Sequence, residues 1–486
     1  MEAEPRRGRG RRGLLAVVLL CALLAAALRA AALIDDPWAN GYDGWYYVLQ
    51  VRSLVDGAPL FADRSLVFVP LVALARLTGD AILGNQLAAC LFAAVAAAGG
   101  ALAGWRWTGR LSAAAVAGGW WALSPLHLGV SAEFLKNSAG VAVLSLLLAA
   151  LPRCERRRGL LAAAISLALL GPLVHKLTGV LGLLAAVGYT AARLLGGRRP
   201  PRWLWGVVGL GLLAVAAGGL LRPSDFLRLL GGEGGHTTRL AAFNSTRLIN
   251  AERVELILVH VAPLALLAGL WQRRHRAACF ALLPLSLAAL APGLPFGWDL
   301  TAWRLLLMGF ISTGLIAAIG VSSLGRARWP AVAVLLSLGL WQAPSIVRAT
   351  QARSPDYSAW ATAIPVLRAT IPPNSRVIAH RGLCGFVWAE AGIICENFQP
   401  SPPHDRWWRI AYGFGPERFV PYVQGGDPAP VVAIPGYTIV WEPHWQRFLV
   451  EEGENFRLAY DPRNPFRVRP AFVYGPGQET PAPQNR

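Results

Sequence analysis

The sequence predicts an α-helical polytopic membrane protein with about eleven transmembrane helices and a small C-terminal extracytoplasmic α/β domain. Long apolar runs recur through most of the chain, and only 15% of its residues are charged, against about 25% in soluble proteins. Arginines gather in every second connection between these runs. That alternation is typical of cytoplasmic loops, which carry an excess of Lys and Arg.

The apolar runs give the expected spans, since a helix needs roughly 20 mostly apolar residues to cross a bilayer. The first run is longer than the apolar core of a signal peptide, about 7–15 residues, so we expect it to remain as an anchor. The apolar segment 65–79 contains Arg76, and we expect it to dip into the membrane or to pack against other helices. The predicted spans are 14–34, 81–104, 111–130, 138–152, 159–175, 177–195, 203–221, 254–271, 277–293, 303–324 and 330–347.

The arginine clusters also explain the formal net charge of +19. They contain nineteen arginines and a single acid, Glu155, so the basic excess is a topology signal, and nucleic acid is not an expected partner. We therefore expect an integral protein of the bacterial cytoplasmic (inner) membrane, with a cytoplasmic N-terminus and an extracytoplasmic C-terminal domain. The clusters are 6–12, 106–110, 153–158, 198–202, 273–276 and 326–328.

The composition changes near residue 348, which predicts a transmembrane domain at 1–347 and a C-terminal domain at 348–486. The second segment is rich in proline and aromatic residues, and its fourteen arginines nearly balance twelve acids. Strand-like and helix-like stretches alternate in it, a pattern that indicates an α/β domain. Cys384 and Cys395 lie in this segment, where they either form a disulfide or pack as two buried thiols.

Four basic side chains stand where predicted spans meet the outer face. Lys136 and Lys176 are the only lysines in the chain, His175 precedes the second of them, and Arg304 begins another span. Such groups can neutralise the phosphate of a lipid-linked substrate. They can also be interfacial anchors of helix ends, as Lys and Arg commonly are.

Three acids on the same face are candidate catalytic groups. Asp43 precedes an amphipathic stretch at 44–56 that suits a helix lying in the membrane interface, so it can be a catalytic carboxylate, a helix N-cap, or both. Asp36 is a catalytic candidate or the ordinary acidic end of a span. Glu133 is a candidate too, or it pairs with Lys136 at helical spacing.

Other polar features have simpler interpretations. The glycine run at 231–235 makes the loop 222–253 a candidate mobile flap, and it lacks the strand–glycine–helix setting and the lysine of a phosphate-binding loop. His127 is expected to be a core or pore-lining residue. No spacing of His, Cys and acids indicates a metal site, and the dependence on a divalent metal stays open.

The sequence Asp43-Gly44-Trp45-Tyr46-Tyr47, in an outer loop after the first span, resembles the glycosyltransferase C superfamily, and its protein mannosyltransferase and aminoarabinose transferase group in particular. These polytopic enzymes use polyprenyl-phosphate-linked sugars, and the resemblance implies that Asp43 is the catalytic acid. Gly44 replaces the usual second acid. Asp36-Pro37-Trp38 is similar to a run in oligosaccharyltransferase catalytic subunits, whose Trp-Trp-Asp signature is missing here.

The sequence therefore predicts an inverting membrane glycosyltransferase that moves a sugar from a polyprenyl-phosphate donor to a lipid, glycan or protein acceptor on the extracytoplasmic face. Asp43 would act as general base, with Asp36 and Glu133 as further catalytic candidates. Lys136, Lys176 and Arg304, with His175 beside them, would bind the donor phosphate. Two alternatives remain, a transporter or flippase for a lipid-linked or anionic solute and a non-catalytic cell-envelope assembly protein.

Overall fold

The computed structural model divides the chain into two compact units, which are described separately. Unit 1 comprises Met1–Asp35 and Asp63–Gln351, and unit 2 comprises Asp36–Ala62 and Ala352–Arg486. The segment that carries Asp43 thus belongs to the same unit as the C-terminal part of the chain. The structure describes residues 4–34, 36–41, 43–61, 63–154, 158–196, 250–270, 275–290, 300–351, 357, 361, 364–370, 377–379, 381–397, 408–411, 432–434 and 471–474.

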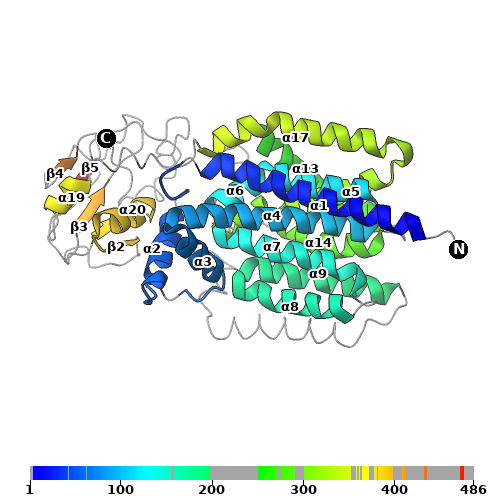
Figure 1. Cartoon of the computed structure of the whole chain (residues 1–486), viewed down its shortest axis with the longest axis horizontal. Coiled ribbons are helices and arrows are strands. Elements are labelled where there is room, and N and C mark those ends of the chain that lie inside the picture. Colours follow the sequence, from blue (N-terminus) through cyan, green and yellow to red (C-terminus); the bar gives the residue numbers. More distant parts are fainter. Residues whose placement is uncertain are drawn as a thin grey trace, which may run out of the picture. The chain divides into compact units, whose positions relative to one another are not determined.

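Unit 1 is a bundle of helices that run side by side (Figure 1). Every predicted span except 203–221, which lies outside the described residues, coincides with one helix or with two consecutive helices. Six helices of the described part are long and apolar enough to cross a membrane, and the others are shorter. The helices of unit 1 are α1 (Glu4–Leu33), α3 (Phe68–Thr78), α4 (Ala81–Thr108), α5 (Leu111–Leu123), α6 (Pro125–Glu133), α7 (Leu135–Ala150), η1 (Leu151–Arg153), α8 (Arg158–Val174), α9 (Lys176–Leu195), α13 (Asn250–Leu270), α14 (Arg276–Leu290), α15 (Leu300–Leu307), α16 (Phe310–Ser322), η3 (Gly325–Ala327) and α17 (Arg328–Gln351).

Small residues let the helices of the bundle approach closely around α4. A Cβ atom at Gly104 would overlap the carbonyl oxygen of Ala113 in α5, and one at Gly99 would overlap the hydroxyl of Ser145 in α7. Helix α3 crosses α4 in the same way, because a Cβ at Gly84 would lie 2.7 Å from the backbone nitrogen of Ala75. Close backbone packing of this kind is how membrane helices associate without a hydrophobic driving force. The expectation that 65–79 packs against other helices is confirmed.

The predicted span 111–130 is broken in the structure into α5 and α6. Ser124 and Pro125 interrupt the helix, and the Ser124 hydroxyl then caps α6 by accepting a hydrogen bond from the backbone N–H of His127 at 3.1 Å. His127 is fully buried, its Nδ1 donates to the carbonyl of Trp121 at 2.7 Å, and its ring stacks on Phe310. It is therefore a core residue of the bundle.

The break is also stabilised by two buried charged side chains. Arg29 of α1 donates to the carbonyl of Ala122, in the last turn of α5. Glu255 of α13 accepts hydrogen bonds from Trp120 Nε1, the Ser124 hydroxyl and the backbone N–H of Leu126. A cation at a helix C-terminus and an anion at the next N-terminus both complement the helix dipoles.

The described part of unit 2 contains helices and a five-stranded sheet of order β2-β1-β3-β5-β4. Strand β1 pairs in parallel with β2 and β3, whereas β3, β5 and β4 pair antiparallel. A disulfide joins Cys384 of α20 to Cys395 of β2, which settles the alternative that the sequence left open. The elements are α2 (Gly44–Val55), α19 (Ile364–Thr370), β1 (Val377–Ala379), α20 (Arg381–Ala391), β2 (Cys395–Asn397), β3 (Trp408–Ala411), β4 (Val432–Ile434) and β5 (Ala471–Tyr474).

Candidate functional site

Asp43 lies at the start of α2, and its carboxylate does not cap the helix. The residue is buried, with 8% of its surface exposed, and its side chain makes no capping hydrogen bond. The turn before it is fixed by Tyr357, whose hydroxyl donates to the carbonyl of Gly41 at 2.9 Å. The carboxylate of Asp43 therefore does not act as the N-cap of α2. The backbone before it is held by the Tyr357 hydrogen bond instead.

Gly44 follows Asp43 where the family pattern has a second acid. A Cβ at Gly44 would lie 3.0 Å from the carbonyl carbon of Ala39 and 3.1 Å from its Cβ, closer than nearly all real contacts of this kind. A side chain at this position would therefore require Ala39 to move by a few tenths of an ångström. This tight packing favours glycine at the position where the resemblance implies a second acid.

Most of the apolar face of α2 is buried within the protein. Trp45, Val48 and Val51 are fully buried. The Trp45 ring meets those of Tyr357 and Phe386 edge to face at 5.6 and 5.5 Å between centroids. The predicted helix at 44–56 is thus present as α2, and most of its apolar face is buried within the protein, whereas Val55 at its end is exposed.

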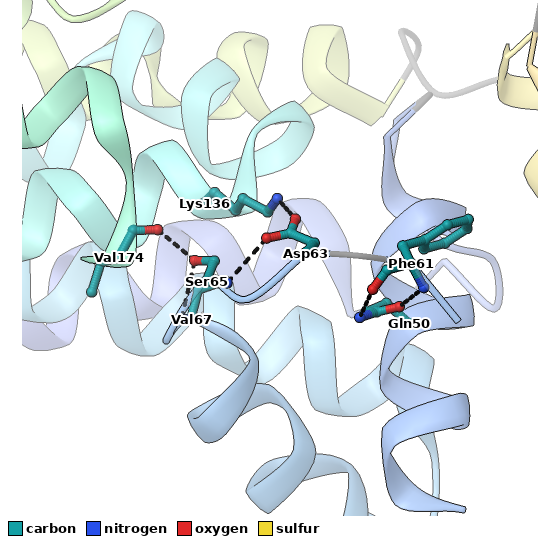
Figure 2. Close-up of polar contacts among 7 residues, drawn as sticks. All are labelled: Gln50, Phe61, Asp63, Ser65, Val67, Lys136 and Val174. Atoms are coloured by element: carbon teal, nitrogen blue, oxygen red, sulfur yellow. Dashed lines mark hydrogen bonds and ion pairs between the residues drawn. The ribbon is translucent and has the colours of Figure 1, made fainter. Parts of the chain in front are cut away.

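Asp36 serves the same turn through its carboxylate. Its Oδ1 accepts a hydrogen bond from the backbone N–H of Trp38 at 3.0 Å, which is an Asx-turn. Gln50 holds the other end of the segment, since its side-chain amide exchanges two hydrogen bonds with the backbone of Phe61, at 2.8 and 3.2 Å (Figure 2). The structure gives Asp36 a local structural role and leaves its catalytic role a prediction.

In unit 1, Lys136 forms an ion pair with Asp63 (Figure 2). Both side chains are about one-fifth exposed, and the ammonium also lies 5.5 Å from the centre of the Phe68 ring. Glu133 ends α6, whereas Lys136 belongs to α7, with Phe134 between the two helices. The expected pairing of Glu133 with Lys136 assumed one continuous helix, and that assumption is wrong.

His175 and Lys176 lie at the junction of α8 and α9. His175 stands between the helices, and its side chain accepts a hydrogen bond from the N–H of Thr178 at the start of α9, at 3.4 Å. Arg304 and Lys136 lie near enough to His175 for their positive charges to act on its ring.

Arg304 approaches the junction of α6 and α7 from α15. Its guanidinium lies 4.6 Å from the centre of the Phe134 ring, two residues before Lys136. Lys136 and Arg304 thus lie near His175, Lys176 follows His175 at the start of α9 with an exposed side chain, and Asp63 pairs with Lys136. We call Asp63, Lys136, His175, Lys176 and Arg304 the basic cluster.

Gly140 permits the two lysine-bearing segments to meet. A Cβ at this position of α7 would overlap the Thr178 hydroxyl and lie 3.0 Å from the Cβ of His175. The N-terminal turn of α9 therefore packs directly on α7, one turn after Lys136. The N-terminal end of a helix carries a partial positive charge, so this contact adds a third source of positive potential to the lysines.

Two acids of the site region were not among the predicted site residues. Asp63 precedes the apolar segment 65–79, and Glu255 lies inside the predicted span 254–271, so neither position suggests a role in a site. Among the described residues, no group of three or more His, Cys, Asp or Glu side chains could hold a metal ion. The loop 222–253, except for residues 250–253 at the start of α13, lies outside the described residues.

No model of a known family matches the chain, and no curated protein is significantly similar to it. Solved structures are similar in fold. The oligosaccharyltransferase of Archaeoglobus fulgidus, in complex with Zn and sulfate, matches with a TM-score of 0.56 and 11% identity, over 94% of this chain and 88% of that one. ArnT from Cupriavidus metallidurans, bound to undecaprenyl phosphate, gives 0.52 and 13%, over 86% and 96%.

A third similar structure is the arabinofuranosyltransferase AftD from Mycobacteria, with a TM-score of 0.51 and 14% identity, over 88% of this chain and 40% of that one. At 11–14% identity, the likeness to these three proteins concerns the fold alone. The chain therefore has the fold that these solved structures share, and this agrees, at the level of the fold, with the resemblance stated from the sequence.

Proposed function

We propose that this protein is an inverting membrane glycosyltransferase that takes a sugar from a polyprenyl-phosphate donor. The observation that carries the proposal is the basic cluster in a chain of this fold: Lys136, Lys176 and Arg304 gather around the α8–α9 junction. Such a cluster suits an anionic lipid head group. ArnT, one of the proteins with this fold, has been solved with undecaprenyl phosphate bound.

The chemistry that the cluster would perform is charge stabilisation at the leaving group. In the reaction, the bond between the sugar C1 and the phosphate oxygen breaks, and a bond from C1 to the acceptor oxygen forms. Lys136, Lys176 and Arg304 would stabilise the negative charge that develops on the departing polyprenyl phosphate. His175 would contribute a hydrogen bond from its ring.

Asp43 would accept the proton of the acceptor hydroxyl as general base, a role typically worth about 10²–10⁴-fold in rate. Its support is the burial of a carboxylate that the helix does not use as a cap. Asp36 would act through the turn that it holds, and Glu133 would act beside the basic cluster from the end of α6. The acceptor would be a lipid, a glycan or a protein.

We further propose that the reaction takes place on the extracytoplasmic face of the bacterial cytoplasmic membrane. The arrangement has about eleven spans, with the C-terminal α/β domain outside and the N-terminus in the cytoplasm. The disulfide between Cys384 and Cys395 supports this orientation, since disulfides persist in oxidising compartments. The arginine clusters on alternate loops support it independently.

The test replaces Asp43 by Asn in the full-length protein, in membranes supplied with labelled polyprenyl-phosphate sugars. We expect transfer to fall by about 10²-fold or more, because Asn keeps the size of the side chain and cannot accept the proton. The matched control is Asp80→Asn, which removes the charge of a carboxylate that caps α4 and leaves a good capping residue. Transfer at the wild-type rate by Asp43→Asn would remove Asp43 from the mechanism.

A further inference from the structure

The ion pair between Asp63 and Lys136 puts a negative charge inside a cluster that otherwise gathers cations (Figure 2). A site that only had to attract a phosphate would gain nothing from a carboxylate at one of its lysines. At a separation of a few ångströms, two like charges repel appreciably even at the effective dielectric constant of a protein surface. The presence of Asp63 therefore calls for an explanation in terms of the ligand's charge.

Asp63 is held in place by a short chain of hydrogen bonds. Its Oδ1 accepts from the backbone N–H of Ser65 at 3.0 Å, while its Oδ2 accepts from Lys136. The Ser65 hydroxyl donates to the carbonyl of Val174, and the N–H of Leu66 donates to that of Leu173 at 3.0 Å. These two carbonyls belong to the last residues of α8, directly before His175. The carboxylate is thus anchored beside the α8–α9 junction, not carried on a loose loop.

The charge of the lipid phosphate changes during the proposed reaction. The donor is a phosphodiester with one negative charge. The product is a phosphomonoester, whose charge is about −1.5 to −2 at pH 7. Three cations alone would therefore hold the product more tightly than the donor, and the site would be blocked by its own leaving group. A fixed negative charge at Lys136 acts in the opposite direction, since it repels a doubly charged head group more than a singly charged one.

We propose that Asp63 is a positioning and specificity-determining residue that weakens the binding of the polyprenyl phosphate product relative to the phosphodiester donor. It acts through Lys136, whose ammonium it orients and partly neutralises. The inference rests on the proposed function, because it assumes that the basic cluster binds the lipid phosphate. It adds that the cluster is adjusted to release the product.

The experiment measures dissociation constants of two probes for the purified full-length protein in nanodiscs, namely undecaprenyl phosphate and its methyl phosphodiester. The variants are Asp63→Asn and Asp63→Ser, which both keep an acceptor for the Ser65 N–H and remove the charge. We expect the preference for the monoester over the diester to rise about tenfold in both variants, since a partly exposed charge acts through screened electrostatics. Asp63→Glu should restore a preference near that of the wild type.

Several results would overturn the inference. An unchanged or reduced monoester preference in the neutral variants, with both probes still binding, would refute the role of Asp63 and leave the proposed function standing. Failure of the wild-type protein to bind either probe would refute both. Asp80→Asn serves as the control, because it removes an acid of unit 1 that caps α4 instead of pairing with Lys136. An equal rise of the monoester preference in Asp80→Asn would show that the effect comes from the total charge of the protein and not from the pair with Lys136. That result would also contradict the proposal.

Discussion

Glu255 shows at the scale of a single residue how the broken span at Ser124 and Pro125 is held. Its carboxylate accepts three hydrogen bonds at 2.7–3.3 Å, from Trp120, Ser124 and Leu126, and only 4% of its surface is exposed. Each buried donor left without an acceptor costs about 1–3 kcal/mol. The acid is thus expected to stabilise the fold of unit 1 rather than to take part in chemistry.

We therefore predict graded losses of stability at this position. Glu255→Gln keeps one acceptor oxygen and should lower the thermal midpoint moderately. Glu255→Leu leaves three donors without an acceptor and should lower the midpoint more, because the free energy of unfolding falls by about 3–9 kcal/mol in all. The measurement is thermal unfolding of the purified protein in detergent. Equal midpoints for Gln and Leu would contradict the hydrogen-bonding role. Undecaprenyl phosphate should still bind to the folded fraction of either variant.

At the same scale, the sequence could predict the cations of the site but not their partners. Lys136, Lys176 and Arg304 stand out because each is a charge at the end of an apolar run. Asp63 precedes Lys136 by 73 residues, and no periodicity or motif relates the two. The sequence shows Gly44 where the resemblance implies an acid, but it could not show that Ala39 approaches this position to 3.0 Å.

At the scale of elements, the positions of the helices follow from hydropathy. The breaks within them and the residues that bury each helix face do not. The spans at 111–130 and 303–324 each became two helices, because capping at Ser124 and the turn at Met308–Gly309 are local events within apolar sequence. The amphipathic pattern of α2 is also the pattern of a helix packed on protein. The partners that bury Trp45 of this helix, Tyr357 and Phe386, lie more than three hundred residues away and could not be read from the pattern.

The contact between α7 and α9 gives a prediction at this scale. Gly140→Ala adds a methyl group that would overlap Thr178 and press on His175, so α9 must shift away from Lys136. Overpacking of this kind costs about 1–3 kcal/mol. We expect a lower thermal midpoint and weaker binding of undecaprenyl phosphate, measured by titration in nanodiscs. The control is Gly129→Ala in α6, where a Cβ meets nothing within 4 Å. Similar losses in both variants would contradict the proposed role of this contact.

At the scale of the whole molecule, the assignment of Asp36–Ala62 to the C-terminal unit could not be read from composition. The sequence places its sharpest change near residue 348, whereas the structure groups the segment around Asp43 with residues 352–486. Contacts such as Tyr357 with Gly41 and Arg52 with Glu390 join parts of the chain that are remote in sequence. The proposed catalytic acid thus belongs to one unit and the proposed phosphate-binding residues to the other.

Because Asp43 belongs to unit 2 and the basic cluster to unit 1, the proposed function requires a particular orientation of the protein in the membrane. If the reaction is extracytoplasmic, unit 2 must be exposed outside the cell and the connections with arginine clusters inside it. We predict that Asp56→Cys, at an exposed position of unit 2, reacts with a membrane-impermeant maleimide in intact cells. Ser323→Cys, exposed beside the cluster at 326–328, should react only after permeabilisation. The four free cysteines of the structure are buried, which keeps the background low.

The reverse labelling pattern would place Asp43 in the cytoplasm and exclude transfer on the outer face. Labelling of both positions in intact cells would mean that the two lie on one side, which contradicts the alternation of arginine clusters. The disulfide gives an independent measurement in the same cells. Cys384 and Cys395 should be linked in protein that is trapped with acid before lysis, because the bond has to form where unit 2 is exposed to an oxidising compartment.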